Sequence, residues 1–422
     1  MAQILPLKTV AVDLTPVLPG GENGGAKIFV LELLRQLRAL APQTNFVLLT
    51  QAASHDELAS MDCLNMRRQL VVGPVAENVL RSRLKGVASR LLQQLPVRTR
   101  RLVGHIRYRT YCAFRHGRAS RSMLRDMKAD LLFCPFTAPT YFESGTPTVC
   151  TIYDLQFKTY PEFFTVEDLA HRERTFIDAC RRATKLTAIS DYSRDSAISH
   201  GGVDAARIRT IYLRMARRIA PEAQRDRSIL DRLDVVTQRY FVYPANFWKH
   251  KNHEMLLTAF GIACHEGLPA DIKLVCTGAP GVRQAWLTSA AGAMHLGDRI
   301  LFPGYLSTAD LAALMANCTA LVFPSLYEGF GLPVIEAMAA GVPVACSNTT
   351  SLPEVAADAA IFFDPRVPTQ IANAMISLLQ NDALRNRLID SGLKRSAEFS
   401  DVARMAREYW QLFELAFAEA KR

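Results

Sequence analysis

Short β-rich runs alternate with longer helical patterns along the whole chain. This alternation of apolar and polar positions is typical of parallel sheets joined by crossover helices. The first half contains the runs at 8–13, 46–50, 70–73, 130–134, 148–152, 185–189 and 208–212. The second half contains the runs at 240–244, 272–277, 299–304, 320–323, 342–346 and 360–363. The pattern therefore predicts an α/β protein with two doubly wound, Rossmann-like sheets.

The length of the chain also favours two domains. It has 422 residues, whereas a single hydrophobic core stops growing near ~250–300 residues. The charged stretch 216–239 has no strand pattern and is the best candidate for the connection. We therefore expect an N-terminal domain at 1–222 and a C-terminal domain at 239–399.

The last segment, 402–420, predicts an amphipathic helix. Large apolar residues such as Tyr409, Leu412, Phe413 and Phe417 lie along one side of it. Another surface must cover that side. From the pattern alone, either the N-terminal domain or the helix's own domain can do so.

Composition gives the broad class of the protein. Hydrophobic residues make up 49% and charged residues 21% of the chain, and no apolar run approaches the roughly 20 residues of a membrane span. The first residues lack a basic start and a long apolar stretch, so we expect no secretory signal and a cytoplasmic location. The nine cysteines are isolated, which favours reduced thiols over disulfides or structural zinc.

The net charge of +10 comes from one segment, 67–128, which holds sixteen Lys or Arg and two acidic residues. Within it, 80–95 predicts a helix with one apolar face and basic flanks, a pattern that can lie on an anionic leaflet at about 1 kcal/mol per basic residue. We expect peripheral attachment to the inner face of the cytoplasmic membrane. The alternative is a core-facing helix with a solvated basic rim. No aromatic platform or RNA motif accompanies the charge, so nucleic acid is not an expected partner.

The most informative segment is 321–345, LVFPSLYEGFGLPVIEAMAAGVPVA. Its first apolar residues predict a buried strand, Gly329 and Gly331 allow a tight turn and close approach to a ligand, and Pro333 suits the start of a helix. A helix N-terminus has unpaired N–H groups and a partial positive charge. The segment therefore predicts a phosphate site.

Two carboxylates in this segment stand eight positions apart. Glu336 lies about one turn into the expected helix, where it can accept hydrogen bonds from the vicinal hydroxyls of a ribose. Glu328 on the loop can reach the other end of the ligand. Taken alone, either residue could equally be a solvated surface glutamate.

The full string FPSLYEGFGLPVIEAMAAGVPV, followed by SLPEVAADAAIFFDP, resembles the donor-site signature of family 4 retaining glycosyltransferases. These enzymes share an E-x7-E pattern and the GT-B fold. The resemblance implies that the final helix, within 400–422, packs back on the N-terminal domain. It also implies that the donor contacts include Glu328, Gly329, Phe330, Gly331, Leu332 and Glu336.

The loop YPANFWKHKNHE follows another expected strand and carries three basic residues, Lys249, His250 and Lys251. Strand ends open toward the crevice of such sheets, so cations belong there. The resemblance implies that Lys251 holds the nucleotide diphosphate. The family's usual arginine falls at Asn246, which leaves Lys249 or His250 for the second phosphate contact.

Near the N-terminus, LPGGENGGAKIFVLELLRQL joins a glycine-rich loop to an amphipathic helix. A glycine loop entering a helix suggests contact with an anion. The spacing is not G-x-G-x-x-G, which argues against a dinucleotide-dependent dehydrogenase. The resemblance implies that Gly24 and Gly25 face the donor phosphate.

Tyr153 and Asp154 follow the strand at 148–152 and should face the crevice. The family frequently has histidine before this aspartate, where it contacts the transferred sugar. A tyrosine can bond or stack on a sugar but cannot act as a base near neutral pH without a large pKa shift. We therefore expect Asp154 to be the catalytic auxiliary beside Glu328, with Tyr153 at the sugar. Alternatively, Asp154 only caps the following turn.

Together with these patterns, the resemblance implies a retaining, metal-independent glycosyltransferase that uses no cofactor. Its expected donor is a nucleotide sugar, GDP-mannose before a UDP-sugar, and its expected acceptor is a hydroxyl of a glycan or lipid-linked glycan in envelope polysaccharide synthesis. Two alternatives stay open: a non-catalytic GT-B scaffold in an assembly complex, and a nucleotide-sugar isomerase.

Overall fold

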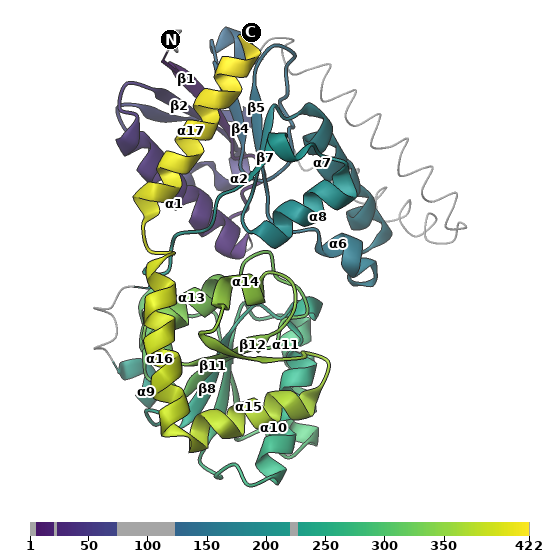
Figure 1. Cartoon of the computed structure of the whole chain (residues 1–422), viewed down its shortest axis with the longest axis vertical. Coiled ribbons are helices and arrows are strands. Elements are labelled where there is room, and N and C mark those ends of the chain that lie inside the picture. The colour runs from purple at the N-terminus through teal and green to yellow at the C-terminus, as the bar shows by residue number, and fades with distance from the viewer. Residues whose placement is uncertain (1–5, 21–22, 74–122, 220–226, 422) are drawn as a thin grey trace.

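The computed structural model describes residues 6–20, 23–73, 123–219 and 227–421. Its strands form one sheet of seven and one of six, all pairings parallel, in the orders β3-β2-β1-β4-β5-β6-β7 and β10-β9-β8-β11-β12-β13. The two sheets belong to two domains that follow one another along the long axis (Figure 1). In both sheets the strand order reverses beside the first strand, which creates a crevice at the carboxyl ends of the strands. The predicted fold class is confirmed.

The N-terminal domain contains the first sheet and the helices on its two faces. Its strands are β1 (Thr9–Asp13), β2 (Asn45–Gln51), β3 (Met66–Val72), β4 (Leu131–Cys134), β5 (Thr148–Ile152), β6 (Lys185–Ala188) and β7 (Ile208–Thr210). Its helices are α1 (Gly24–Leu40), α2 (Ala52–His55), α5 (Met123–Asp126), α6 (Gln156–Thr159), α7 (Val166–Arg182) and α8 (Asp191–Gly201).

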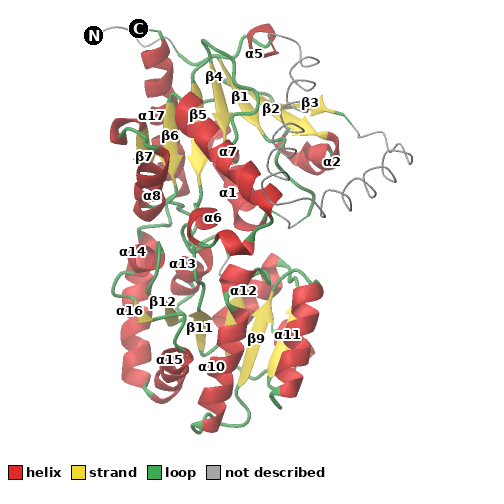
Figure 2. Cartoon of the chain, turned by 90° about the vertical axis from the view of Figure 1, so that its right-hand side faces the viewer, coloured by secondary structure: helices red, strands yellow, loops and turns green. Residues whose placement is uncertain are grey.

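The C-terminal domain repeats this plan with the second sheet (Figure 2). Its strands are β8 (Tyr240–Pro244), β9 (Lys273–Thr277), β10 (Ile300–Gly304), β11 (Ala320–Phe323), β12 (Val344–Ser347) and β13 (Ala360–Phe363). The helices that follow the connection are α9 (Ser228–Arg232), α10 (His253–His265), α11 (Val282–Ala293), α12 (Thr308–Ala316), α13 (Leu332–Ala339), α14 (Leu352–Ala356), α15 (Pro368–Gln380), α16 (Asp382–Ala397) and α17 (Val402–Ala420).

One strand begins earlier than the sequence predicts. We expected it at 70–73, but β3 covers Met66–Val72. It is the edge strand beside β2 and most of its residues are half-buried or exposed. Arg67 and Arg68 can therefore sit within it, and Arg68 pairs with Asp62 at 2.9 Å. Charged side chains are common on sheet edges. Because Arg67 and Arg68 interrupt the apolar pattern, the sequence did not predict the first half of this strand.

Alternation along the strands places the two faces of the first sheet against different helices. Val10 and Val12 of β1 lie in a core cluster with residues of α1 and α17, which pack side by side (Figure 1). Ala11 between them lies in a cluster with Phe176 of α7. The central strand is therefore buried on both faces, as its unbroken apolar run predicts.

The final helix covers the N-terminal domain. After α16 the chain leaves the C-terminal domain and returns as α17 (Figure 1). Tyr409, Phe413 and Phe417 are buried in the core of the first sheet. The Tyr409 hydroxyl lies 3.3 Å from that of Thr151 and 3.2 Å from that of Thr187. The crossing that the resemblance implied is confirmed.

The predicted connection at 216–239 is only partly a linker. Ala216 is buried, and its N–H donates to the carbonyl of Phe399 at 3.0 Å. This bond joins the two segments in which the chain passes from one domain to the other. Helix α9 follows, with Ile229 and Leu230 in the core of the C-terminal domain. The sequence interpretation missed this helix because few apolar residues stand among many charged ones.

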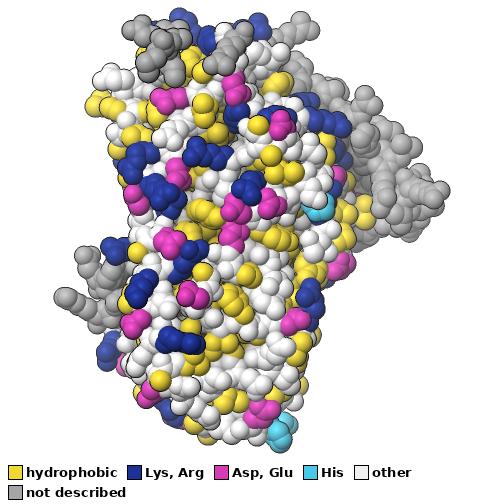
Figure 3. Space-filling view, in the orientation of Figure 1, with side chains coloured by type: hydrophobic (Ala, Val, Ile, Leu, Met, Phe, Trp, Pro, Cys, Tyr) yellow, Lys and Arg dark blue, Asp and Glu magenta, His cyan; other side chains and the backbone are white. Residues whose placement is uncertain are grey.

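No helix in the described ranges is long and apolar enough to cross a membrane. On the face shown in Figure 3, basic and acidic side chains are interspersed. The predicted helix at 80–95, and most of the basic segment 67–128, lie outside the described residues. Membrane attachment through this segment stays a prediction.

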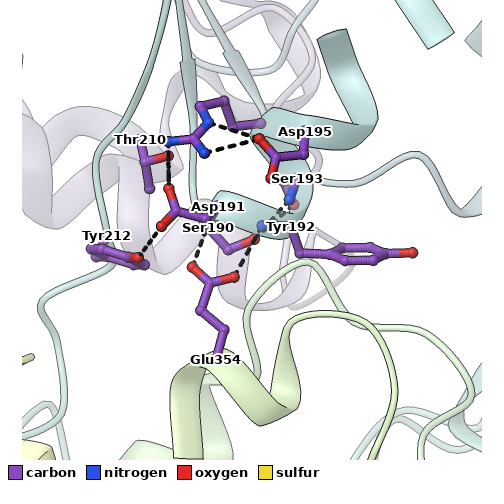
Figure 4. Close-up of polar contacts among 9 residues, drawn as sticks. Ser190, Asp191, Tyr192, Ser193, Asp195, Thr210, Tyr212 and Glu354 are labelled. Carbon is purple, nitrogen blue, oxygen red and sulfur yellow. Dashed lines mark hydrogen bonds and ion pairs between the residues drawn. The ribbon is translucent and has the colours of Figure 1, made fainter. Parts of the chain in front are cut away.

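A carboxylate of the C-terminal domain caps a helix of the N-terminal domain (Figure 4). Glu354 on α14 accepts hydrogen bonds from the N–H groups of Asp191 at 2.6 Å and Tyr192 at 2.9 Å, at the start of α8. These N–H groups have no partner within their helix, and the helix dipole favours a negative charge there. The Asp191 carboxylate accepts from the hydroxyls of Thr210 and Tyr212. Glu354 is therefore one of the contacts that set how the domains sit relative to each other.

We expect Glu354→Ala to loosen this contact. Hydrogen bonds to a charged group contribute about 1.5–3 kcal/mol, so the free energy of unfolding should fall by roughly that amount. The radius of gyration from solution X-ray scattering should rise in the ligand-free protein. Glu266→Ala, at an exposed glutamate of the C-terminal domain, is the control. Indistinguishable scattering and stability for the two variants would contradict the role of Glu354.

Candidate active site

A cavity of about 1200 Å³ lies between the two domains. Every site residue predicted from the sequence lines it. These residues are Gly24, Gly25, Tyr153, Asp154, Asn246, Lys249, Lys251, Glu328, Gly329, Phe330, Gly331, Leu332 and Glu336. The structure thus brings together segments from both halves of the chain, although it does not by itself assign their roles.

The starts of α1 and α13, one from each domain, meet at this cavity. Helix α1 begins at Gly24 and α13 begins at Leu332, and neither has a side-chain cap or an acidic residue in its first turn. A Cβ atom added at Gly25 would lie 3.2 Å from Cδ1 of Leu332, so the two helix starts are adjacent. Both present unpaired N–H groups and a partial positive charge to one space. Such a space suits an anion with two phosphates.

Two glycines allow the domains to meet here. Gly331, just before α13, has φ of +100°, a conformation that side chains rarely adopt. A Cβ atom at Gly329 would lie 2.2 Å from the carbonyl oxygen of Tyr153, in the other domain. We expected Gly329 to allow close approach to a ligand. The structure shows that the absence of a side chain at Gly329 is required by the protein backbone at the end of β5, and its approach to a ligand stays a prediction.

Lys251 and Glu328 form an ion pair, with 2.6 Å between Nζ and Oε1. Asn252 holds this lysine's turn in place, because its Nδ2 donates to the carbonyls of Pro324 at 3.1 Å and Pro365 at 2.8 Å. Pro324 belongs to the loop that carries Glu328. The pair is therefore fixed within the C-terminal domain before any donor binds.

Glu336 is only 2% exposed and pairs with Arg218, whose Nε lies 2.6 Å from Oε1. Burial alone would lower the pKa of Arg218, but the charge of Glu336 and their hydrogen bond raise it. The arginine comes from the connection between the domains and belongs to no motif. It orients the carboxylate that we expected to hold a ribose.

The loop after β8 offers fewer cations than its sequence suggests. Burial, together with the charges of Lys251 and Arg172, lowers the pKa of His250 to about 2. The imidazole is therefore neutral near pH 7, so it can offer a phosphate an N–H group but no positive charge. The second phosphate contact, from Lys249 or His250, stays a prediction. Asn246 has a structural bond, since its Oδ1 accepts from the N–H of Ala279 at 2.9 Å.

Asp154 of the N-terminal domain lines the same cavity as Lys251 and Glu328. Its Oδ1 accepts from the N–H of Gln156 at 3.1 Å, so the side chain does cap the following turn. The side chain also lines the cavity. Burial raises the pKa of Asp154, and the nearby charge of Glu328 adds to that effect. Its catalytic role stays a prediction.

Tyr153 belongs mainly to the core. Its ring centroid lies 6.1 Å from that of Phe29 and 6.4 Å from that of Phe136. Its hydroxyl is buried and has no hydrogen-bond partner among the described residues. Burial, with a smaller effect of Tyr409, raises the pKa of Tyr153 well above its ordinary value, so the phenol cannot act as a base. A contact of Tyr153 with the sugar, by bonding or by stacking, stays a prediction.

Three further residues shape the site. Lys27 donates to the carbonyls of Leu18 and Gly20 and pairs with Glu57 at 2.6 Å, which holds the glycine loop. Gln156 is 7% exposed, lines the cavity, and has a buried Nε2 without a partner in the described structure. Arg218, described above, is the third. Only Gln156 had a sequence signal, because it closely follows a strand end.

Metal ligands were also sought in the described ranges. No group of three or more His, Cys, Asp or Glu residues there is arranged to hold a metal ion. The positive groups at the cavity include Arg172 and Arg283 besides the side chains and helix starts described above.

Two Rossmann-like domains with a phosphate-suited cavity between them, and a last helix that crosses back, define the GT-B fold. The family description "Glycosyltransferase Family 4" matches residues 23–213, and "Glycosyl transferases group 1" matches residues 227–395. Together these matches cover both domains. The chain belongs to family 4 of the glycosyltransferases.

Individual relatives agree with this assignment. The chain is 31% identical over 291 residues to O-antigen chain mannosyltransferase B of Escherichia coli, covering 68% of this chain and 74% of that protein. It is 30% identical over 271 residues to the serotype-specific mannosyltransferase WbdA of Escherichia coli, covering 60% of this chain and 32% of that protein. The crystal structure of Anabaena Alr3699/HepE with UDP-glucose superposes with a TM-score of 0.68 at 15% identity, covering 96% and 98% of the two chains.

The unpaired hydroxyl of Tyr153 gives a prediction. Tyr153→Phe removes a buried polar group that lacks a partner, so we expect the free energy of unfolding to rise by about 1 kcal/mol. Glycosyl transfer should change less than threefold. Urea denaturation and a transfer assay measure the two effects.

The control is Tyr240→Phe, because the buried hydroxyl of Tyr240 donates to the carbonyl of Leu314 at 2.6 Å. That variant should lose about 1 kcal/mol. If Tyr153→Phe instead loses stability or most of its transfer activity, the hydroxyl of Tyr153 makes a hydrogen bond in solution, and the account of an unpaired hydroxyl is wrong.

Proposed function

We propose that this chain transfers a mannosyl residue from GDP-mannose, with retention of configuration, to a hydroxyl of a glycan or lipid-linked glycan in envelope polysaccharide synthesis. The observation that carries the proposal is the convergence of two helix N-termini on one cavity beside Lys251, Glu328 and Glu336. The mannosyltransferase relatives support the choice of sugar. The basic segment 67–128 would hold the enzyme at an anionic membrane surface.

The diphosphate of the donor lies at the starts of α1 and α13. There it receives hydrogen bonds from backbone N–H groups and a contact from Lys251. A lysine has three donors, so Lys251 can keep its bond to Glu328 and still reach a phosphate oxygen. The partial positive charges at the starts of α1 and α13, together with the ammonium of Lys251, offset the negative charge of the diphosphate.

The ribose lies against Glu336. Arg218 occupies Oε1 of that carboxylate, and the other oxygen accepts from a ribose hydroxyl. Since Glu336 is nearly fully buried, its hydrogen bonds to a ligand act in a medium of low polarity and are strong. This arrangement separates the nucleoside end from the sugar end, where Glu328 lies.

In the reaction, the bond between the anomeric carbon and the diphosphate oxygen breaks while the acceptor oxygen bonds to that carbon on the same face. The acceptor proton passes to the departing phosphate oxygen. Lys251 and the helix amides stabilise the charge that develops on the leaving group, and Glu328 stabilises positive charge on the sugar ring. These groups supply positive charge directly, so we propose activity without an added divalent ion.

The test is a comparison of GDP-mannose, GDP, UDP-glucose and UDP by thermal shift, with slow donor hydrolysis as the activity readout. A ligand at 100 times its dissociation constant adds about 2.7 kcal/mol of stability. We expect GDP-mannose and GDP to stabilise the protein and GDP-mannose to be hydrolysed. Stabilisation by the uridine ligands alone, or by none, would overturn the proposal.

Variants then test the site within the same assay. Glu336→Ala should weaken GDP-mannose binding about tenfold or more, since a hydrogen bond to a charged group contributes roughly 1.5–3 kcal/mol. Glu328→Ala should keep donor binding and lower turnover by about 10²–10³-fold. Glu266→Ala, away from the cavity, should match the wild type. Normal binding and turnover in both site variants would refute the assignment.

A further inference from the structure

A second cavity adjoins the first on the side of the N-terminal domain. Its volume is about 290 Å³, and Asp154 and Arg172 line both cavities. It lies between α7, the end of β5 and the loop after β4. We call it the α7 groove; its polar wall consists of Thr137, Asp154, Asp168, His171, Arg172 and Thr175. A ligand here would lie beside the predicted reaction centre without entering the donor site.

The charges of the α7 groove favour a neutral ligand. Two carboxylates, Asp154 and Asp168, oppose one guanidinium, Arg172. Burial, with the charges of Arg174 and Arg172, lowers the pKa of His171, so that the imidazole is neutral near pH 7. A site with this balance does not attract a phosphate or an acidic sugar. Mixed donors and acceptors instead suit the hydroxyls of a neutral saccharide.

The floor of the α7 groove is aromatic. Phe157 and Phe176 are buried at 4% and 2% exposure, and they line the groove together with Phe136. An apolar floor with a few polar groups is the usual composition of a small-molecule site. The volume lies at the small end of such sites, near 300 Å³, which fits one sugar unit better than a lipid chain.

Two side chains are held in unusual ways at the wall. Thr137 has φ of +67°, which is strained for a β-branched residue, and its hydroxyl donates to the carbonyl of Thr151 at 2.7 Å. The Arg172 guanidinium stacks 4.7 Å from the ring centroid of Phe164. A stacked guanidinium keeps its in-plane N–H groups available for hydrogen bonds. Strain and preorganised donors at one wall are typical of a binding site.

We propose that the α7 groove binds a neutral sugar unit of the acceptor glycan and directs its hydroxyl toward Asp154 and the donor cavity. Arg172 is a positioning residue at the boundary between the two cavities. The proposal rests on the proposed transfer function. It adds the class of acceptor unit and the elements that hold it.

The test uses Thr175→Phe, which fills the α7 groove without changing charge. The probes are GDP-mannose as donor and a fluorescently labelled α-mannobioside as acceptor. We expect the KM for the mannobioside to rise at least tenfold, while GDP-mannose hydrolysis and thermal stabilisation by GDP stay within twofold of wild type. The matched control is Thr258→Phe on α10, at an exposed position, which should leave both readouts unchanged.

A second variant keeps the test decisive if Thr175→Phe does not fold. Arg172→Lys retains the charge but loses the planar fork, and it should also raise the mannobioside KM more than tenfold. An acceptor KM within twofold of wild type in the folded variants overturns the α7 groove as an acceptor site. If the wild type neither binds nor hydrolyses GDP-mannose, the proposed function fails instead.

Discussion

The structure depends on bringing two helix N-termini together across a cleft. The starts of α1 and α13 each carry a partial positive charge, so their approach is electrostatically unfavourable when nothing lies between them. Other contacts hold the domains in place, including Gly329 against the carbonyl of Tyr153 and Glu354 on the start of α8. A diphosphate between the helix starts would turn their repulsion into attraction. Donor binding at this place would therefore be coupled to domain closure by charge.

The two domains divide the work around this point. The C-terminal domain holds paired carboxylates in place before the donor arrives: Lys251 restrains Glu328, and Arg218 from the connection restrains Glu336. The N-terminal domain contributes Asp154 and the α7 groove. Helix α17 belongs to the core of the first sheet although it follows the second in sequence. The two segments that connect the domains are bonded to each other at Ala216 and Phe399, and Arg218 of the first lines the cavity.

The features that the sequence could predict are local ones. Short apolar runs identified the thirteen strands of the two described sheets, although the run at 70–73 missed the start of β3. The string around Glu328 and Glu336 identified residues that line the cavity. The remaining features join distant positions. Arg218 and Glu336 are 118 residues apart, and Glu354 and Asp191 are 163 residues apart, so no spacing in the sequence links them. The orientation of Tyr153 toward the core likewise depends on tertiary packing.

The central claim is that the diphosphate binds between the starts of α1 and α13. A crystal structure of the protein with GDP-mannose tests it most directly. The account predicts phosphate oxygens within hydrogen-bond distance, about 2.7–3.2 Å, of backbone N–H groups at both helix starts, with Lys251 on the same diphosphate. A diphosphate that contacts neither helix start, or only one with the domains apart, would contradict it.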